Sequence, residues 1–206
     1  MLPPRTLLAP AGLARAALFG AVVGTLLDGA HTWSGTTAYP DPVMWRAAWW
    51  APLTFALAYA LEASLYTWAR QRSGRPPVTA AVRWTCAAVF AGLYVASGFL
   101  PVSNPAKLAV LLAGAGALWA ATDRTPQTLA VAAAAAVIGP GTEITLVHLG
   151  LFAHLQPDVW GIPLWLPALY LASAPGVGPL LGWLGAGQAG PAAARLATSN
   201  LTPTGQ

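Results

Sequence analysis

Charged side chains are scarce in this chain of 206 residues, of which only 8% are aspartate, glutamate, lysine or arginine. A soluble globular domain carries about 25% of such residues, because its surface must be solvated. The scarcity therefore excludes a soluble enzyme and a disordered tail. The net charge of +4 includes no run of like charges, so nucleic acid is not an expected partner.

Cysteine is nearly absent as well. Cys86 is the only one, which excludes an internal disulfide, and its apolar surroundings predict a small buried side chain. The sequence also lacks an HExxH zinc motif, a paired-cysteine motif, a serine-nucleophile motif and a phosphate-binding loop. We therefore expect a protein that is not an enzyme and that has no cofactor and no metal site.

Long apolar segments make up most of what remains. Hydrophobic residues account for 56% of the chain, and the mean hydropathy is +0.58. A helix that crosses a bilayer needs about 20 mostly apolar residues. Segments of this kind lie at about 11–30, 47–69, 80–100, 105–122, 127–152 and 160–186.

These segments are too long and too little alternating for barrel strands. They predict an all-α fold, a polytopic membrane bundle of six transmembrane helices. Residues 1–187 would form this single domain, and residues 188–206 a flexible C-terminal tail. The first segment has a second interpretation, because Arg5 and Arg15 precede an apolar run in the manner of a cleaved signal peptide. Gly20 and Gly24 form a GxxxG pattern, which favours a retained, closely packed helix.

The basic residues predict an orientation. With both termini in the cytoplasm, only Arg46 and Lys107 fall outside, and the other basic residues fall inside. The ten tryptophans agree with this topology, because indole rings favour the membrane interface. Those expected at the outer boundary are Trp33, Trp45, Trp49, Trp50, Trp160 and Trp165, and those at the inner boundary are Trp68, Trp84 and Trp183. Trp119 lies one turn inside the fourth segment.

Proline and glycine interrupt the last two segments. Gly139-Pro140-Gly141 predicts a kink or an unwound turn in the fifth, and residues 173–179 predict a break in the sixth. Irregular backbone inside a membrane is tolerated where protein or a cavity shields it. The two segments therefore either border an internal cavity or are merely bent.

Three carboxylates fall within or at the ends of the segments. Glu143 follows the break in the fifth segment and is expected to face the interior with a partner. Glu62 is expected near the inner surface and Asp123 at a solvated helix end. His148 and His154 are not at helical spacing from Glu143, so they do not predict a metal site. A small ion-coupled transporter that uses Glu143, or an intramembrane lipid enzyme that uses Glu143 or Asp123, are the alternative functions.

Several short motifs resemble a known family. They are Trp-Trp-Ala-Pro at 49–52, an Arg-to-Gly segment at 83–92, Leu-Trp-Ala-Ala-Thr-Asp-Arg-Thr at 118–125, Trp-Leu-Pro at 165–167 and a glycine-bearing turn at 176–178. In order and spacing, over about residues 45–185, they are similar to the Insig (insulin-induced gene) family of six-span membrane proteins. The resemblance implies a non-enzymatic lipid sensor, because animal members bind oxysterols and membrane proteins that carry a sterol-sensing domain.

The resemblance also implies roles for particular residues. Phe90 and Trp119 correspond to lipid-pocket residues, and Asp123 with Arg124 corresponds to the motif that engages partner proteins. Glu143 is an addition to the family pattern, and Pro140 and Glu143 are expected beside the polar head of the bound lipid because of the break in the fifth segment, not because of the resemblance. The family's polar positions early in the fourth segment are Ala106 and Val110 here, which favours a diacylglycerol-like lipid or a phospholipid over a sterol.

The composition also bears on location and assembly. Nine arginines against one lysine, with abundant alanine and glycine, are typical of a GC-rich bacterial gene. We therefore expect a multi-pass protein of a bacterial cell membrane, or of the endoplasmic reticulum if the source is eukaryotic. Small-residue faces at Gly20 and Gly24, at Gly178 and Gly182, and at residues 132–136 suggest a homo-oligomer.

Overall fold

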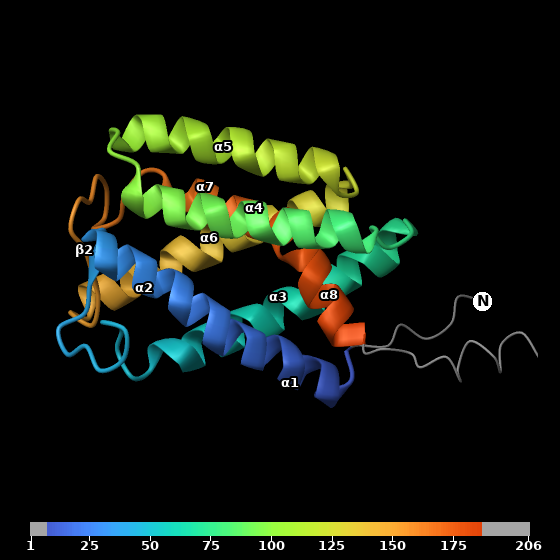
Figure 1. Ribbon diagram of the computed structural model, residues 1–206, viewed down its shortest axis with the longest axis horizontal. Helices are drawn as coiled ribbons and strands as arrows, with labels where there is room; N and C mark the ends of the chain where they lie inside the picture. The colour runs from blue at the N-terminus through green and yellow to red at the C-terminus, as the bar shows by residue number, and fades with distance from the viewer. Residues whose placement is uncertain (1–7, 187–206) are drawn as a thin grey trace, which may run out of the picture.

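The computed structural model describes residues 8–186, which form a bundle of helices lying side by side (Figure 1). The expected all-α class is confirmed. The tail predicted for 188–206 lies outside the described residues. The helices are α1 (Pro10–Phe19), α2 (Thr25–Ser34), α3 (Ala51–Ser73), α4 (Ala80–Phe99), α5 (Asn104–Ala121), α6 (Pro126–His148), α7 (Leu166–Gly176) and α8 (Gly178–Ala186).

Local sequence explains where most helices begin. Proline occupies one of the first two positions of α3, α5, α6 and α7, where its missing N–H removes no helical hydrogen bond. Thr79 and Thr125 cap α4 and α6, because each hydroxyl accepts a hydrogen bond from the backbone N–H three residues later. Gly74 ends α3 in the left-handed conformation, with φ of 64°.

The first predicted segment is one rod in which a π-helical turn, η1 (Gly20–Gly24), joins α1 to α2. It packs against α3 so closely that a Cβ at Gly24 would lie 2.7 Å from Cγ of Phe55. Gly178 likewise faces the ring of Tyr66. These two glycine faces are therefore occupied by side chains of α3 within the monomer.

The two predicted interruptions differ in outcome. The last segment is indeed broken at Val177, between α7 and α8, with Pro175 and Pro179 on either side. By contrast, α6 runs without an unwound turn through Pro140, whose side chain is buried. Of the two predicted outcomes, the unwound turn is wrong, because α6 stays helical where it packs against α7, and the kink stays a prediction.

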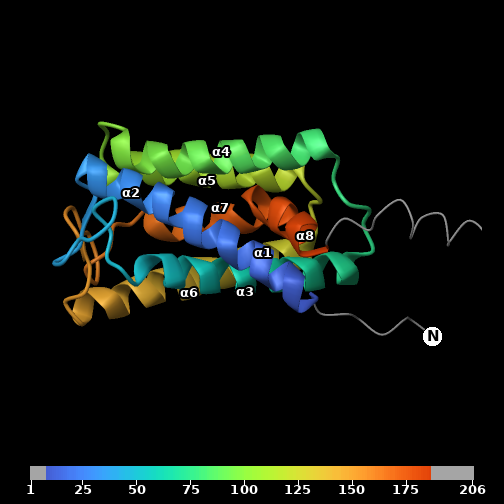
Figure 2. The same ribbon diagram turned by 60° about the horizontal axis from the view of Figure 1, so that its bottom comes forward.

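The helix α7 occupies the centre of the bundle, where it contacts α4, α5, α6 and α8 (Figure 2). Nearly all of its residues are buried, including Leu166, Leu169 and Ala172. Within residues 8–186, three helical stretches are long and apolar enough to cross a membrane: Pro10–Ser34, Ala80–Phe99 and Pro126–His148.

The two ends of the bundle differ in character. At one end, β1 (Thr37–Ala38) pairs antiparallel with β2 (Ala153–His154), so that Thr37 lies opposite His154. This ladder ties the α2–α3 loop to the α6–α7 loop. The α3–α4 and α5–α6 loops lie at the other end (Figure 1). The described basic residues follow the predicted segregation, because Arg46 and Lys107 lie at the β1–β2 end and the others do not.

The tryptophans follow their predicted places with one exception. Trp33, Trp49 and Trp160 expose about 70% of their surface, as interface residues would. Trp165 exposes only 1% and donates a hydrogen bond from Nε1 to Oδ1 of Asn104 at 3.0 Å. Its expected role at the outer boundary is therefore wrong, because it fills the core beneath the start of α5.

Candidate functional site

An apolar cavity of about 270 Å³ lies between α3, α4, α6 and α7. Its walls are mostly aliphatic and aromatic, with a few polar groups. The lining residues include Phe55, Ala58, Leu65, Phe90, Val131, Ala135, Leu166 and Leu169. This outcome favours the cavity-bordering interpretation of the last two segments, because α6 and α7 supply much of its wall.

The cavity opens sideways between α3 and α6. Leu57, Leu61 and Ile138 line it, yet each exposes about half of its surface or more. Residues that touch both the cavity and the outer surface of the bundle mark a mouth. Because this mouth is apolar, it suits the hydrocarbon chain of a lipid better than a water-soluble ligand.

Glu143 forms the polar end of the cavity. The hydroxyl of Tyr170 donates to Oε1 at 2.6 Å, and Nε2 of His154 lies 2.7 Å from Oε2. Tyr170 comes from α7 and His154 from β2, so two elements converge on one carboxylate of α6. The expected interior partner of Glu143 is thus found, in residues that the sequence analysis did not assign to it.

A second, smaller cavity of about 50 Å³ adjoins this polar end. Tyr94, Thr142, Glu143 and Tyr170 line both cavities, so the two spaces share a wall. Asp28 lies on the far side, where its Oδ2 accepts a hydrogen bond of 3.0 Å from the hydroxyl of Tyr39. A small compartment lined by hydrogen-bonding groups therefore lies beside the apolar cavity.

Tyr39 keeps its proton in this compartment. Burial raises the pKa of the Tyr39 phenol above its ordinary value of 10.0, and the neighbouring Asp28 carboxylate raises it further. The hydroxyl is therefore a permanent donor toward Asp28. Sequence reasoning missed Tyr39, because a single tyrosine in a loop carries no signal of its partner.

Glu62 lies in the cavity wall on α3 rather than at the inner surface, where it was expected. Its Oε1 is buried and has no hydrogen-bond partner, and Ser173 lines the same part of the wall. The cavity thus has a second polar position, about three helical turns from the start of α3.

The predicted lipid residues divide into two groups. Phe90 and Glu143 line the cavity. Pro140 is buried on α6 and Trp119 lies at the far end of α5, and neither is part of the described wall. Nε1 of Trp119 instead donates to the carbonyl of Thr125 at 3.3 Å, which holds the α5–α6 loop.

Asp123 is buried rather than solvated. One oxygen pairs with the guanidinium of Arg70 at 2.8 Å and accepts from the hydroxyl of Thr128 at 2.8 Å. The other accepts from the backbone N–H of Thr125 at 3.2 Å. The expectation of a solvated helix end is wrong for Asp123, whose side chain is 2% exposed, but Arg124 is exposed.

These bonds determine the charge of Asp123. Burial by itself raises the pKa of the carboxyl, but the hydrogen bonds from Arg70, Thr128 and Thr125 outweigh burial and lower the pKa below 3.8. Asp123 is therefore an anion that joins α3 to the α5–α6 loop. It holds the shape of the surface on which Arg124 lies.

The carboxylates do not form a catalytic pair. Asp123 precedes α6 and Glu143 lies near its other end, so the helix separates them by roughly 25 Å. General acid–base chemistry needs groups within hydrogen-bond reach of one reacting site. Within residues 8–186, no group of three or more His, Cys, Asp or Glu side chains is placed to hold a metal ion.

Comparisons with known proteins complete the picture. No family model matches the chain. An INSIG protein homolog of Mycolicibacterium vanbaalenii is 33% identical over 162 residues, which cover 75% of this chain and 78% of that protein. The 1.9 Å crystal structure of MvINS, a mycobacterial Insig homolog from Mycobacterium vanbaalenii, matches 89% of this chain and 98% of its own at 27% identity, with a TM-score of 0.75.

A second structure, of MvINS cross-linked as a trimer, matches with a TM-score of 0.76 and the same identity and coverage. The sequence relative and the two structures agree with each other and with the ordered motifs at 49–52, 118–125 and 165–167. The chain belongs to the Insig family.

Proposed function

We propose that this Insig homolog is a six-span membrane protein that binds one lipid in the cavity between α3, α4, α6 and α7 and catalyses no reaction. The observation that carries the proposal is the pairing of an apolar cavity, open sideways, with a compact polar end at Glu143. Amphipathic lipids have the same division into apolar chains and a polar head.

Helix lengths support six crossings. In addition to the three stretches that satisfy length and hydropathy, α3 has 23 residues and α5 has 18, or about 35 and 27 Å. The hydrocarbon core of a bilayer is about 30 Å thick. The helices α7 and α8 follow each other across the bundle as a sixth span. Both termini then lie in the cytoplasm of a bacterial cell.

The polar end favours a small, uncharged head. A carboxylate can accept about four hydrogen bonds, and Glu143 accepts from Tyr170 and His154, so it retains capacity for a hydroxyl of the ligand. The adjoining compartment of about 50 Å³ is too small for a phosphate-bearing head group. A diacylglycerol fits this chemistry, with its free hydroxyl at Glu143 and its acyl chains passing between α3 and α6.

Native mass spectrometry of the detergent-extracted full chain tests the proposal. We expect a retained diacylglycerol, and a thermal stabilisation by added dioleoylglycerol that its methyl ether does not produce. Glu143→Gln should weaken binding about tenfold, because a hydrogen bond to a charged acceptor contributes about 1.5–3 kcal/mol. Absence of any lipid-dependent shift would refute lipid binding.

Two alanines of α6 provide a matched pair of variants. Ala135 lines the cavity and Ala133 is exposed on the outer surface of the same helix. Ala135→Phe should fill the cavity and abolish lipid retention, whereas Ala133→Phe should leave it intact. If Glu143→Gln instead keeps the lipid but abolishes proton or ion flux into proteoliposomes, the protein is a transporter.

Self-association is part of the proposal, because the related MvINS has been crystallised as a cross-linked trimer. The outer surface of α5 carries a strip of small exposed residues, Ala109, Ala113, Gly116 and Ala117. Small residues at this spacing let membrane helices approach closely. Light scattering of the full chain in detergent would measure the number of copies.

A further inference from the structure

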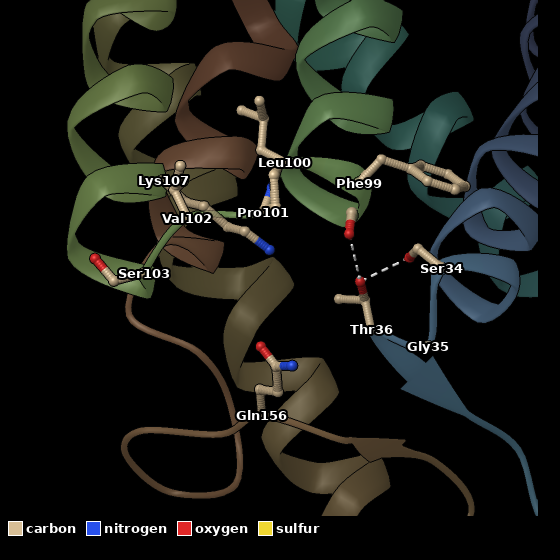
Figure 3. A pocket seen from close by; sticks show the side chains of 11 residues that line it. Ser34, Gly35, Thr36, Phe99, Leu100, Pro101, Val102, Ser103, Lys107 and Gln156 are labelled. Atoms are coloured by element: carbon tan, nitrogen blue, oxygen red, sulfur yellow. Dashed lines mark hydrogen bonds between the residues drawn. The ribbon is translucent and has the colours of Figure 1, made fainter.

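A second pocket lies at the β1–β2 end of the bundle, apart from the lipid cavity. It measures about 360 Å³ and lies where the ends of α2 and α4 meet the start of α5 (Figure 3). Its polar lining residues are Ser34, Thr36, Ser103, Lys107 and Gln156. It shares no lining residue with the cavity between α3, α4, α6 and α7.

Lys107 is an unusual residue to find in this pocket. It exposes 6% of its surface, and the structure gives its ammonium no hydrogen bond and no ion pair within residues 8–186. Its one described interaction is with the ring of Trp165, at 5.8 Å from the centroid. Figure 3 shows the ammonium pointing into the pocket, between Pro101 and Gln156. Among the described residues, the ammonium thus faces the pocket without a carboxylate beside it, and an anion there would gain a charge-assisted contact.

The position of Lys107 in α5 strengthens this argument. The first turn of a helix presents unpaired backbone N–H groups and a partial positive charge, which repels a cation and attracts an anion. Ser103, the residue before α5, makes no side-chain hydrogen bond to cap them. Asp158 does not neutralise Lys107, because Asn104 and the backbone N–H of Leu164 hold its carboxylate at 2.7 and 2.9 Å.

We propose that this pocket binds the phosphate group of a ligand through the Lys107 ammonium, with the Ser103 hydroxyl and the Gln156 amide as further donors. The rim favours the phosphate of an anionic phospholipid, because Phe99 and Val102 line the pocket and expose about half of their surface. An acyl chain would follow these side chains along the outside of α4. Free inorganic phosphate could bind through the same donors, and the experiment below distinguishes it from a phospholipid.

The test uses the full chain in detergent and two readouts, thermal stability and native mass spectrometry. The added probes are dioleoylphosphatidylglycerol, dioleoylglycerol and inorganic phosphate. We expect phosphatidylglycerol to bind and stabilise the protein, and Lys107→Gln to weaken that binding at least about tenfold, because a charge-assisted hydrogen bond is lost. Stabilisation by inorganic phosphate that also depends on Lys107 would identify the free anion as the source.

Arg46→Gln is the matched control. This substitution also removes one positive charge at the same end of the bundle. Arg46 lies over the ring of Trp33, outside the pocket. Without ligand, Lys107→Gln should be about as stable as the wild type, since the ammonium makes no hydrogen bond or ion pair within residues 8–186. Gln156→Ala, at an exposed position, should weaken phosphatidylglycerol binding without unfolding.

Equal binding of phosphatidylglycerol by Lys107→Gln and the wild type would overturn the proposal, as would equal weakening by Arg46→Gln. This test does not depend on lipid binding in the central cavity, because dioleoylglycerol should bind the Lys107→Gln variant as well as it binds the wild type. The failure of the phosphate-site proposal and the failure of the proposed lipid binding in the central cavity would therefore give different results.

Discussion

Asp123 and Glu143 are both acidic residues of the same bundle, but their surroundings are opposite. Asp123, at the basic end, has its two oxygens occupied by Arg70, Thr125 and Thr128 and faces no cavity. Glu143, at the β1–β2 end, accepts hydrogen bonds from Tyr170 and His154, has acceptor sites to spare, and lines two adjacent cavities.

The difference separates a structural carboxylate from a binding one. A carboxylate has about four acceptor sites. Asp123 accepts four hydrogen bonds and has none of these sites left for a ligand, whereas Glu143 accepts two. Family resemblance assigns Asp123 to partner engagement, but the contacts place it beneath the surface that Arg124 occupies. Its effect on a partner would therefore pass through the shape of the α5–α6 loop.

The largest expected effect is on stability, from Asp123→Ala. Removing one member of a buried ion pair leaves Arg70 uncompensated, which costs about 3–5 kcal/mol. Thermal unfolding of the detergent-solubilised protein should show a large decrease in Tm. Arg124→Ala, at the exposed neighbouring position, should change stability by about 0.5 kcal/mol or less. Similar decreases for both variants would contradict the structural assignment.

A smaller effect is expected from Tyr170→Phe at the other end. This change removes the hydroxyl that donates to Glu143 and should destabilise the protein by about 1–2 kcal/mol. Lipid retention should change as well, because Tyr170 lines both cavities. A loss of stability as great as that of Asp123→Ala, with unchanged lipid retention, would show that both carboxylates are structural.

The smallest expected effect is the loss of folding stability at acidic pH. Because the pKa of Asp123 is lowered in the folded protein, its ionised form adds stability above its ordinary pKa of 3.8, and this contribution is lost as pH falls through the lower folded value. Unfolding measured from pH 6 downward should show the wild type losing this increment below about pH 4. Asp123→Asn should lack that increment, so the two curves should converge in acid.

Sequence reasoning reached the fold because apolar length and proline positions act locally. Pro52, Pro105 and Pro126 each lie in the first turn of a helix, and this preference of proline does not depend on how the helices pack. Phe90, singled out by family resemblance, and Glu143, singled out as a rare intramembrane carboxylate, both line the cavity, and their role in lipid binding stays a prediction. These signals need no knowledge of how the helices pack.

It failed where the answer depends on packing. His154 was set aside because five- and six-residue spacings do not share a helix face, yet α6 ends at His148 and β2 brings His154 back to Glu143. Gly139-Pro140-Gly141 predicted a kink or an unwound turn. The missing side chain of Gly139 instead lets the ring of Tyr170 pack on α6, because a Cβ at Gly139 would lie 2.2 Å from Cδ1 of Tyr170. The hydrogen bond between Tyr39 and Asp28 could not be predicted, because it depends on the path of the loop between α2 and α3.

The π-helical turn at Gly20–Gly24 has an evolutionary consequence. A π turn is an α-helix that has accommodated one extra residue. The turn absorbs that residue within the rod, in which α1 packs against α3 and α8 while α2 packs against α4 and carries Asp28 and His31 inward. Deleting one residue here should therefore convert the turn into regular α-helix and leave the orientation of α2 relative to α1 unchanged. Relatives without the turn should align with a one-residue gap and keep the same face of α2 toward Tyr94.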